Sequence, residues 1–227
     1  MPDNKPMSRH LPIGVLISGS GTNLQAILDA IAAKTLNATI QIVVSNRSGA
    51  YGLVRAENRG IPTQVLDHKN FSSREAFDQA LVDILRGHGV ELVVLAGFTR
   101  LLSPVFVKAF SNRIMNIHPA LLPAFPGLHV QRKALEHGVR FSGCTVHFVN
   151  EACDEGPIII QAVVPVYPDD TEGSLTARIL EQEHRIYPRA IQLYSEGRLR
   201  VEGRRVLVDV AIEDQQTQVL FQPPLKG

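Results

Sequence analysis

Two polar residues that could carry acid–base chemistry stand two positions apart at the end of a short apolar run. Asn116 and His118 close the run 114–117, which we expect to form a strand. Side chains two positions apart point to the same face of a strand, so both groups would face one space. A histidine can move a proton near neutral pH, and an asparagine amide can donate to a developing oxyanion. The pair therefore predicts acid–base chemistry, although a lone histidine is more often a packing residue.

The loop 150–156 offers acidic side chains that could partner the histidine. It carries Glu151, Asp154 and Glu155 between two apolar runs that we expect to be strands. A carboxylate beside a histidine favours the charged imidazolium. Acidic residues in loops are usually only solvated, however, and the residue types alone do not choose Asp154 over its neighbours.

The remaining histidines and the two cysteines give no sign of a metal centre. His147 lies in the middle of a strand-like run, where a structural role is favoured over a catalytic one. His129 and His137 have no acidic or sulfur partner at the spacing of metal ligands. Cys144 and Cys153 also lack that spacing, and unpaired thiols are typical of the reducing cytoplasm. We therefore expect a cytoplasmic protein without a metal.

A glycine-rich segment lies between the first predicted strand and the first predicted helix. Gly19 and Gly21 allow the backbone to approach an anion closely, and a helix N-terminus presents unpaired N–H groups. Thr22 and Asn23 add side-chain donors. A dinucleotide-binding loop would have a third glycine and an acidic residue about 20 positions later, and both are missing here. The loop therefore favours a monophosphate, with a tight turn that holds no ligand as the alternative.

Strands that alternate with helices must position these residues. Short β-branched runs predict strands at residues 13–17, 40–44, 63–66, 91–96, 114–117, 145–149 and 158–166. Apolar residues spaced three and four apart predict helices over residues 24–31, 53–58, 72–85, 131–136 and 174–195. Ser72 and Glu75 have capping-box spacing and would open the third of these helices. This alternation predicts an α/β fold, Rossmann-like, with a mostly parallel twisted sheet and helices on both faces.

Length and charge indicate one domain that handles small molecules. The chain has 227 residues, and its 23 basic and 22 acidic side chains give a net charge of +1. Such a balance creates no field that would attract nucleic acid or a membrane surface. We assign residues 11–203 to one domain with two functional halves, of which the first binds phosphate. Residues 1–10 and 204–227 would be terminal extensions, and the protein would be a monomer or homodimer.

Segments in one order along the chain resemble the phosphoribosylglycinamide formyltransferases, a family of folate-dependent enzymes. They run from about Ile13 to Val201 and include residues 17–27, 94–98, 116–123, 126–129, 146–149 and 182–184. The resemblance implies that the formyl group of 10-formyltetrahydrofolate is transferred to the glycine amine of glycinamide ribonucleotide. It also implies that the C-terminal half binds the folate, which is a co-substrate, and that no metal takes part.

The resemblance assigns roles residue by residue. The catalytic group would be Asn116, His118 and Asp154, so the resemblance selects the acid that residue types could not. The residues that bind the ribonucleotide would be Gly21, Thr22, Asn23 and Glu183. The residues that bind the folate would be Arg74, Thr99, Arg100, Leu101, Leu102 and Asn116. Within the catalytic group, His118 would act as acid or base, Asn116 would stabilise the oxyanion, and Asp154 would hold a water that relays the proton.

Three positions depart from the family pattern. Thr99 stands where methionine is frequent, Ala120 where serine is found, and Ala124 where lysine is common. The loss of a cation near the site predicts an effect on substrate affinity, while the catalytic group is unchanged.

Two related enzymes and one binding module are the alternatives. A hydrolase of 10-formyltetrahydrofolate shares the catalytic group but has an N-terminal regulatory domain, which the ten or so residues before the first strand cannot form. A methionyl-tRNA formyltransferase has a C-terminal domain that helps to bind tRNA, for which the charge of this chain is too balanced. A non-catalytic phosphate-binding module would not need the intact catalytic group.

Overall fold

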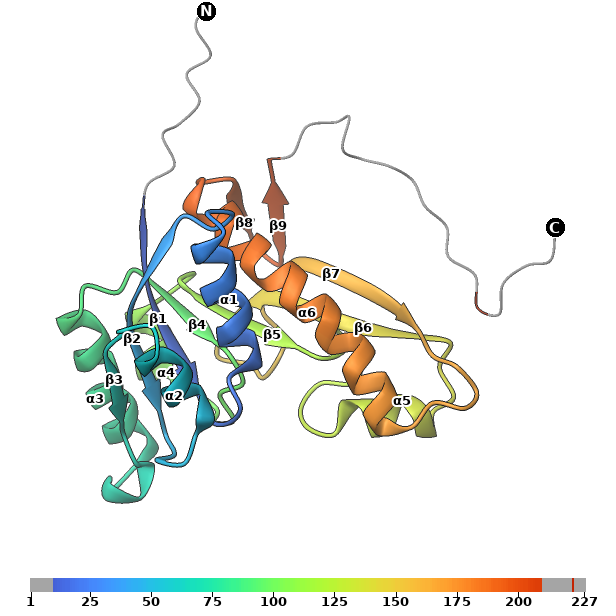
Figure 1. The fold of residues 1–227 in the computed structure, drawn as a ribbon, viewed down its shortest axis with the longest axis horizontal. Helices are drawn as coiled ribbons and strands as arrows, with labels where there is room; N and C mark the ends of the chain where they lie inside the picture. The colour runs from blue at the N-terminus through green and yellow to red at the C-terminus, as the bar shows by residue number, and fades with distance from the viewer. Residues whose placement is uncertain (1–9, 210–221, 223–227) are drawn as a thin grey trace, which may run out of the picture.

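The computed structural model describes residues 10–209 and 222, which contain one nine-stranded sheet (Figure 1). The strands are β1 (Leu11–Ile17), β2 (Ala38–Ser45), β3 (Thr63–Val65), β4 (Leu92–Leu95), β5 (Ile114–His118), β6 (Phe141–Phe148), β7 (Ile158–Pro165), β8 (Leu199–Glu202) and β9 (Arg205–Val208). Their order is β3-β2-β1-β4-β5-β6-β7-β9-β8. The pairs from β3 to β5 are parallel, and β6 is antiparallel to both of its neighbours. The predicted α/β class with a mostly parallel sheet is confirmed.

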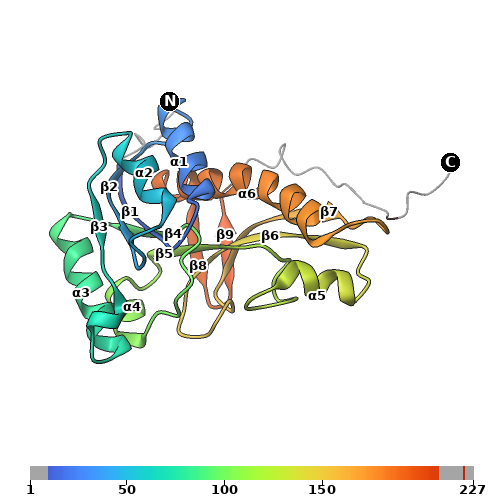
Figure 2. The same ribbon diagram turned by 60° about the horizontal axis from the view of Figure 1, so that its bottom comes forward.

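Helices cover both faces of the parallel part of the sheet (Figure 2). The helices are α1 (Thr22–Ala32), α2 (Tyr51–Glu57), α3 (Arg74–Gly87), α4 (Pro104–Ala109), α5 (Val130–Glu136) and α6 (Glu172–Ser195), with a short 3-10 turn at His68–Asn70. One buried apolar cluster contains residues of α1, α2 and α6, and a second contains residues of α3 and α4. The neighbouring β2 residues Val43 and Val44 belong to different clusters, as alternation along a strand requires.

The central strands are apolar because both of their faces lie under helices. All residues of β4 are buried, and in β1 the side chains from Val15 to Ile17 are fully enclosed. Strands of a parallel sheet that is covered on both faces have such continuous apolar runs, which makes them easy to predict. The polar residues of interest follow directly where these runs end.

The second half of the domain packs against the long helix α6. Residues of α5, β6, β7 and the first part of α6 form a third apolar cluster. Farther along α6, the buried hydroxyl of Tyr187 donates to the carbonyl oxygens of Leu95 at 3.0 Å and Met115 at 2.9 Å. Tyr187 therefore connects α6 to β4, which precedes the predicted folate-binding residues 99–102, and to β5, which carries the predicted catalytic residues Asn116 and His118.

Some element boundaries differ from the prediction. Ser73, and not Ser72, caps α3, since its side chain accepts from the N–H of Ala76. The helix α4 was not predicted, although Pro104 at its first turn is a helix-start signal. The strands β8 and β9 form an antiparallel pair at one edge of the sheet, and residues 210–221 and 223–227 lie outside the described ranges. No helix in the described ranges is long and apolar enough to cross a membrane.

Candidate active site

The glycine-rich loop lies at the carboxyl end of β1, next to the end of β4. β1 pairs with β2 on one side and β4 on the other, so the strand order reverses here, and open α/β sheets bind ligands at such a reversal. Residues 19–23 of the loop, with Ala96 and Gly97, line a hollow of about 160 Å³. Gly21 has φ 70° and precedes α1 without a side-chain cap. The first-turn N–H groups of α1 are therefore available to an anion.

Asn23 joins this loop to α6. Its Nδ2 atom donates to Oε2 of Glu183 at 2.7 Å, and both side chains are buried. Burial raises the pKa of Glu183, and the hydrogen bond from Asn23 opposes that rise. The Oδ1 atom of Asn23 is buried and has no hydrogen-bond partner among the described residues. The pair thus offers a carboxyl group and an unmet acceptor to a ligand that brings N–H or O–H donors.

Asn116 pairs across the sheet with His147. The two residues are register partners of β5 and β6, so their side chains share one face, and Asn116 Nδ2 lies 3.2 Å from His147 Nε2. The other ring nitrogen, Nδ1, lies 3.0 Å from the carbonyl oxygen of Phe148 and therefore carries a proton. Burial lowers the pKa of His147, which keeps the ring neutral and leaves Nε2 free to accept from the amide. His147 thereby fixes the orientation of Asn116.

His118 ends β5 with both ring nitrogens facing acceptors. Nε2 lies 2.9 Å from the carbonyl oxygen of Phe125, which can only accept, so this nitrogen carries a proton. Nδ1 lies 3.5 Å from Oδ2 of Asp154, and the two side chains are only 6% and 13% exposed. The predicted acid–base group therefore faces a carboxylate in a space that is largely closed to water.

The position of Asp154 is set by contacts of its loop with two other segments. Its Oδ2 atom accepts from the backbone N–H of Gly127 at 2.9 Å, and its backbone has φ 55°. Two residues later, a Cβ on Gly156 would lie 1.7 Å from the carbonyl oxygen of Phe148, so only glycine fits there. This close approach holds the loop against the end of β6 and brings Asp154, but not Glu151 or Glu155, to His118.

The predicted folate segment connects the end of β4 to α4. The N–H of Thr99 donates to the hydroxyl of Ser18 at 3.0 Å, and that of Ser103 donates to Oδ2 of buried Asp78 at 2.5 Å. The guanidinium of Arg100 lies over the ring of Phe77, 5.0 Å from its centroid. The segment is therefore anchored at one end to Ser18, which follows β1, and at the other end to Asp78 of α3.

Three of the predicted folate residues, Arg74, Thr99 and Leu101, are exposed. Leu101 is 60% exposed between the anchors of the segment. Arg74 is the first residue of α3, and its Nε atom lies 3.6 Å from Oε1 of Glu75. Leu102, in contrast, packs against the apolar cluster under α3 and α4. The exposed side chain of Leu101 offers a surface on which a flat apolar ligand can pack.

The structure therefore gathers most of the predicted residues at one edge of the sheet, at the carboxyl ends of β1, β4 and β5. His147 is the residue that sequence reasoning set aside, and its signal would have been the antiparallel register that pairs it with Asn116. The described residues contain no group of three or more histidine, cysteine or acidic side chains placed to hold a metal ion.

Comparison with known proteins identifies the domain. Residues 11–191 match the family model described as formyl transferase. The chain is 47% identical over 197 residues to the phosphoribosylglycinamide formyltransferase of Escherichia coli. The matched residues cover 87% of this chain and 93% of that one. It is 51% identical over 191 residues to the trifunctional purine biosynthetic protein adenosine-3 of Drosophila melanogaster, covering 83% of this chain. The chain spans only 14% of the length of that larger protein.

Solved structures show the same similarity. The crystal structure of glycinamide ribonucleotide transformylase 1 from Symbiobacterium toebii superposes with a TM-score of 0.86 at 56% identity, over 87% of this chain and 93% of that one. The phosphoribosylglycinamide formyltransferase of Coxiella burnetii has a TM-score of 0.85 at 44% identity, over 88% and 94%. The match to the family model covers most of the chain, and the similarity extends over nearly all of these structures. The chain belongs to the formyl transferase family.

Proposed function

We propose that this site transfers the formyl group of 10-formyltetrahydrofolate to the glycine amine of glycinamide ribonucleotide. The observation that carries the proposal is the convergence of Asn116, His118 and Asp154 at the end of β5, with His118 Nδ1 3.5 Å from Asp154 Oδ2. The names of the Escherichia coli and Coxiella burnetii relatives support this acceptor. The product would be formylglycinamide ribonucleotide, a step of purine biosynthesis.

The three residues provide the groups that such a transfer requires. A neutral amine attacks the formyl carbon and forms a tetrahedral intermediate with negative charge on oxygen. The amide of Asn116 can donate to that oxygen, a contact worth about 3–4 kcal/mol in comparable sites. His118 can take part in moving the proton from the attacking amine to the nitrogen that leaves, with Asp154 ordering a water that relays it. Low exposure of His118 and Asp154 strengthens these contacts.

The two substrates would bind on either side of this group. The hollow beside Gly21, Thr22 and Asn23 suits a phosphate, and buried Glu183 suits the hydroxyl or amine groups of the ribonucleotide. The folate would lie along Arg74, Thr99, Arg100, Leu101 and Leu102, with its reactive nitrogen near Asn116. The proposal includes a cytoplasmic location. It also includes a monomeric or homodimeric state, and light scattering would measure that oligomeric state.

A spectroscopic assay tests this proposal directly. Purified protein is mixed with 10-formyltetrahydrofolate, and formation of tetrahydrofolate is followed with and without glycinamide ribonucleotide. Acceptor-dependent turnover is expected. Turnover with release of formate in the absence of the acceptor would instead indicate the hydrolase, and the absence of turnover in both mixtures would indicate a binding module. His118→Ala should abolish the acceptor-dependent rate, and its retention would contradict the central role of that residue.

A further inference from the structure

Arg55, a residue of α2 that lies outside the proposed catalytic and binding groups, contacts the glycine-rich loop from the outside. Its Nε atom donates to the carbonyl oxygen of Ser20 at 2.9 Å, and its Nη1 atom donates to Oε1 of Gln25 at 3.0 Å. The guanidinium also lies over the ring of Tyr51, 5.0 Å from its centroid. The side chain is therefore held at three points, and its charge is fixed next to the loop.

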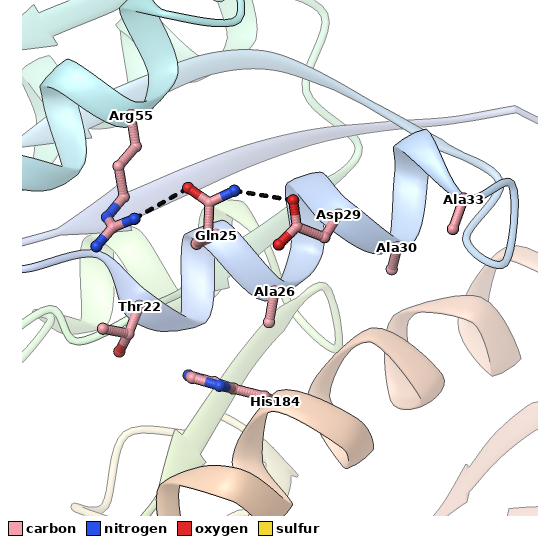
Figure 3. Close-up of a pocket in the computed structure, with 8 residues that line it drawn as sticks. All are labelled: Thr22, Gln25, Ala26, Asp29, Ala30, Ala33, Arg55 and His184. Carbon is pink, nitrogen blue, oxygen red and sulfur yellow. Dashed lines mark hydrogen bonds between the residues drawn. The ribbon is translucent and has the colours of Figure 1, made fainter.

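Gln25 orients Arg55 because its own amide is held at the other end. Its Nε2 atom donates to Oδ1 of Asp29 at 2.9 Å, so its oxygen is turned toward the arginine (Figure 3). Arg59 contacts the same carboxylate oxygen of Asp29 at 3.2 Å. Arg55 and Gln25 line a groove of about 620 Å³. Thr22 lines both this groove and the hollow beside the loop. This chain of contacts connects α2 to α1 along the outer side of the loop.

The contacts from α2 determine which way the loop peptides face. The N–H of Gly52 donates to the carbonyl oxygen of Gly19 at 3.1 Å, and Arg55 takes the carbonyl oxygen of Ser20. In a trans peptide the carbonyl and the following N–H point in opposite directions. The N–H groups of Ser20 and Gly21 therefore point away from α2, and both residues line the hollow of about 160 Å³. α2 can approach so closely because residue 52 is glycine, whose Cβ would lie 2.6 Å from Cδ1 of Ile17.

We propose that Arg55 is a positioning residue for phosphate recognition, and that it gives the site its preference for a phosphomonoester over the free sugar. It fixes the peptide between Ser20 and Gly21 so that its N–H faces the ligand, and it places a permanent positive charge behind that peptide. Only a guanidinium can donate to Ser20 and Gln25 at once while it stacks on Tyr51, because its donors form a rigid planar fork. The identity of the sugar phosphate as a ribonucleotide rests on the proposed function, but the preference itself requires only a phosphate.

Binding of ribose 5-phosphate and of ribose, measured by titration calorimetry in the absence of folate, tests this inference. Wild-type protein should bind the phosphate ester, and Arg55→Met should weaken that binding by about tenfold or more, the size expected for loss of a charged hydrogen bond. Arg55→Lys keeps the positive charge but not the planar fork of donors, so its affinity for ribose 5-phosphate should lie between those of the wild type and Arg55→Met. Gln25→Ala should produce a smaller loss by releasing the second anchor. Arg204→Met removes an exposed arginine between β8 and β9 and should leave the affinity unchanged.

Several results would overturn the inference. Equal affinity of the wild type for ribose 5-phosphate and ribose would do so, as would an Arg55→Met protein that is folded and keeps the wild-type ratio of these affinities. Should Arg55→Met fail to fold, the same comparison is made with Arg55→Lys and Gln25→Ala. If both variants keep the wild-type ratio of affinities for ribose 5-phosphate and ribose, the inference is refuted. Formyl transfer is not measured in this experiment, so a protein without transferase activity that still shows the expected ratios would contradict the proposed function alone.

Discussion

The contact between Asn116 and His147 can be tested by a double-mutant cycle on the formyl-transfer rate. The His147 ring accepts from the Asn116 amide at 3.2 Å, and its Nε2 atom also lies 3.8 Å from Oδ1 of Asp154. Because a neutral ring forms no ion pair and 3.8 Å is too long for a hydrogen bond, the effect of His147 on catalysis should pass through the Asn116 amide. Leucine is a suitable replacement for His147, which is only 1% exposed, because it fills much of the same buried space without an acceptor. Asn116→Ala removes the amide itself.

The expected magnitudes follow from the contacts. Asn116→Ala loses the donor to the oxyanion, about 3–4 kcal/mol, and should lower kcat by about 10²–10³-fold. His147→Leu loses one hydrogen bond between neutral groups, about 1 kcal/mol, which corresponds to roughly fivefold in kcat. In the Asn116→Ala background, His147→Leu should lower kcat no further. A fivefold loss in both backgrounds would mean that His147 acts independently of Asn116, and the reasoning would be refuted.

The same pair predicts a dependence of stability on pH. Burial lowers the pKa of His147 from its ordinary 6.5, so between that value and its folded-state pKa the unfolded chain binds a proton that the folded chain does not. The free energy of unfolding should therefore fall as the pH falls below 6.5, and His147→Leu should lack this contribution. Urea denaturation of both proteins at a series of pH values measures the difference. Parallel pH profiles would contradict the assignment of a neutral, buried ring.

Three further predictions concern other parts of the fold. Tyr187→Phe removes the hydroxyl proton that the carbonyl oxygens of Leu95 and Met115 share and should cost about 1 kcal/mol, seen by calorimetry as a Tm lower by about 2–4 °C; an unchanged Tm would show that the hydroxyl does not stabilise this contact. Gly156→Ala must displace the loop that carries Asp154, so kcat should fall at least tenfold while the circular dichroism spectrum stays native, whereas full activity would mean that the loop adapts. Cys144 is buried and burial raises its pKa to about 12, so a thiol reagent should modify exposed Cys153 in the native protein and Cys144 only after unfolding.

Local patterns in the sequence are sufficient to predict most elements and the loops that carry the candidate site. The buried strand ending at residue 95 and the strand ending in Asn116 and His118 are clear because parallel strands under two helical layers must be apolar. Topology then places the residues that follow such strands at one edge of the sheet. For this reason the order of strands and helices along the chain predicts that the glycine loop, the folate segment and the catalytic pair lie near one another.

Features that depend on pairing between distant segments could not be predicted in this way. His147 reads as a structural residue within its own strand, and only the antiparallel register of β5 and β6 sets it against Asn116. Asp154 has two acidic neighbours of nearly equal character, and it is the close approach of Gly156 to β6 that turns one of them toward His118. Family resemblance selects Asp154, the acid that the structure places beside His118, because it carries information on such contacts, which residue types do not.

The link between Asn23 and Glu183 shows the same principle at the opposite side of the site. These residues are far apart in the sequence, and no local pattern connects them, yet they form a buried 2.7 Å hydrogen bond. A buried carboxyl group with a raised pKa is costly to the fold, and so is an amide oxygen that has no hydrogen-bond partner in the described part of the chain. Their cost is offset when a ligand supplies the missing donors, so the place where local sequence rules are broken is also the place where a substrate is expected to bind.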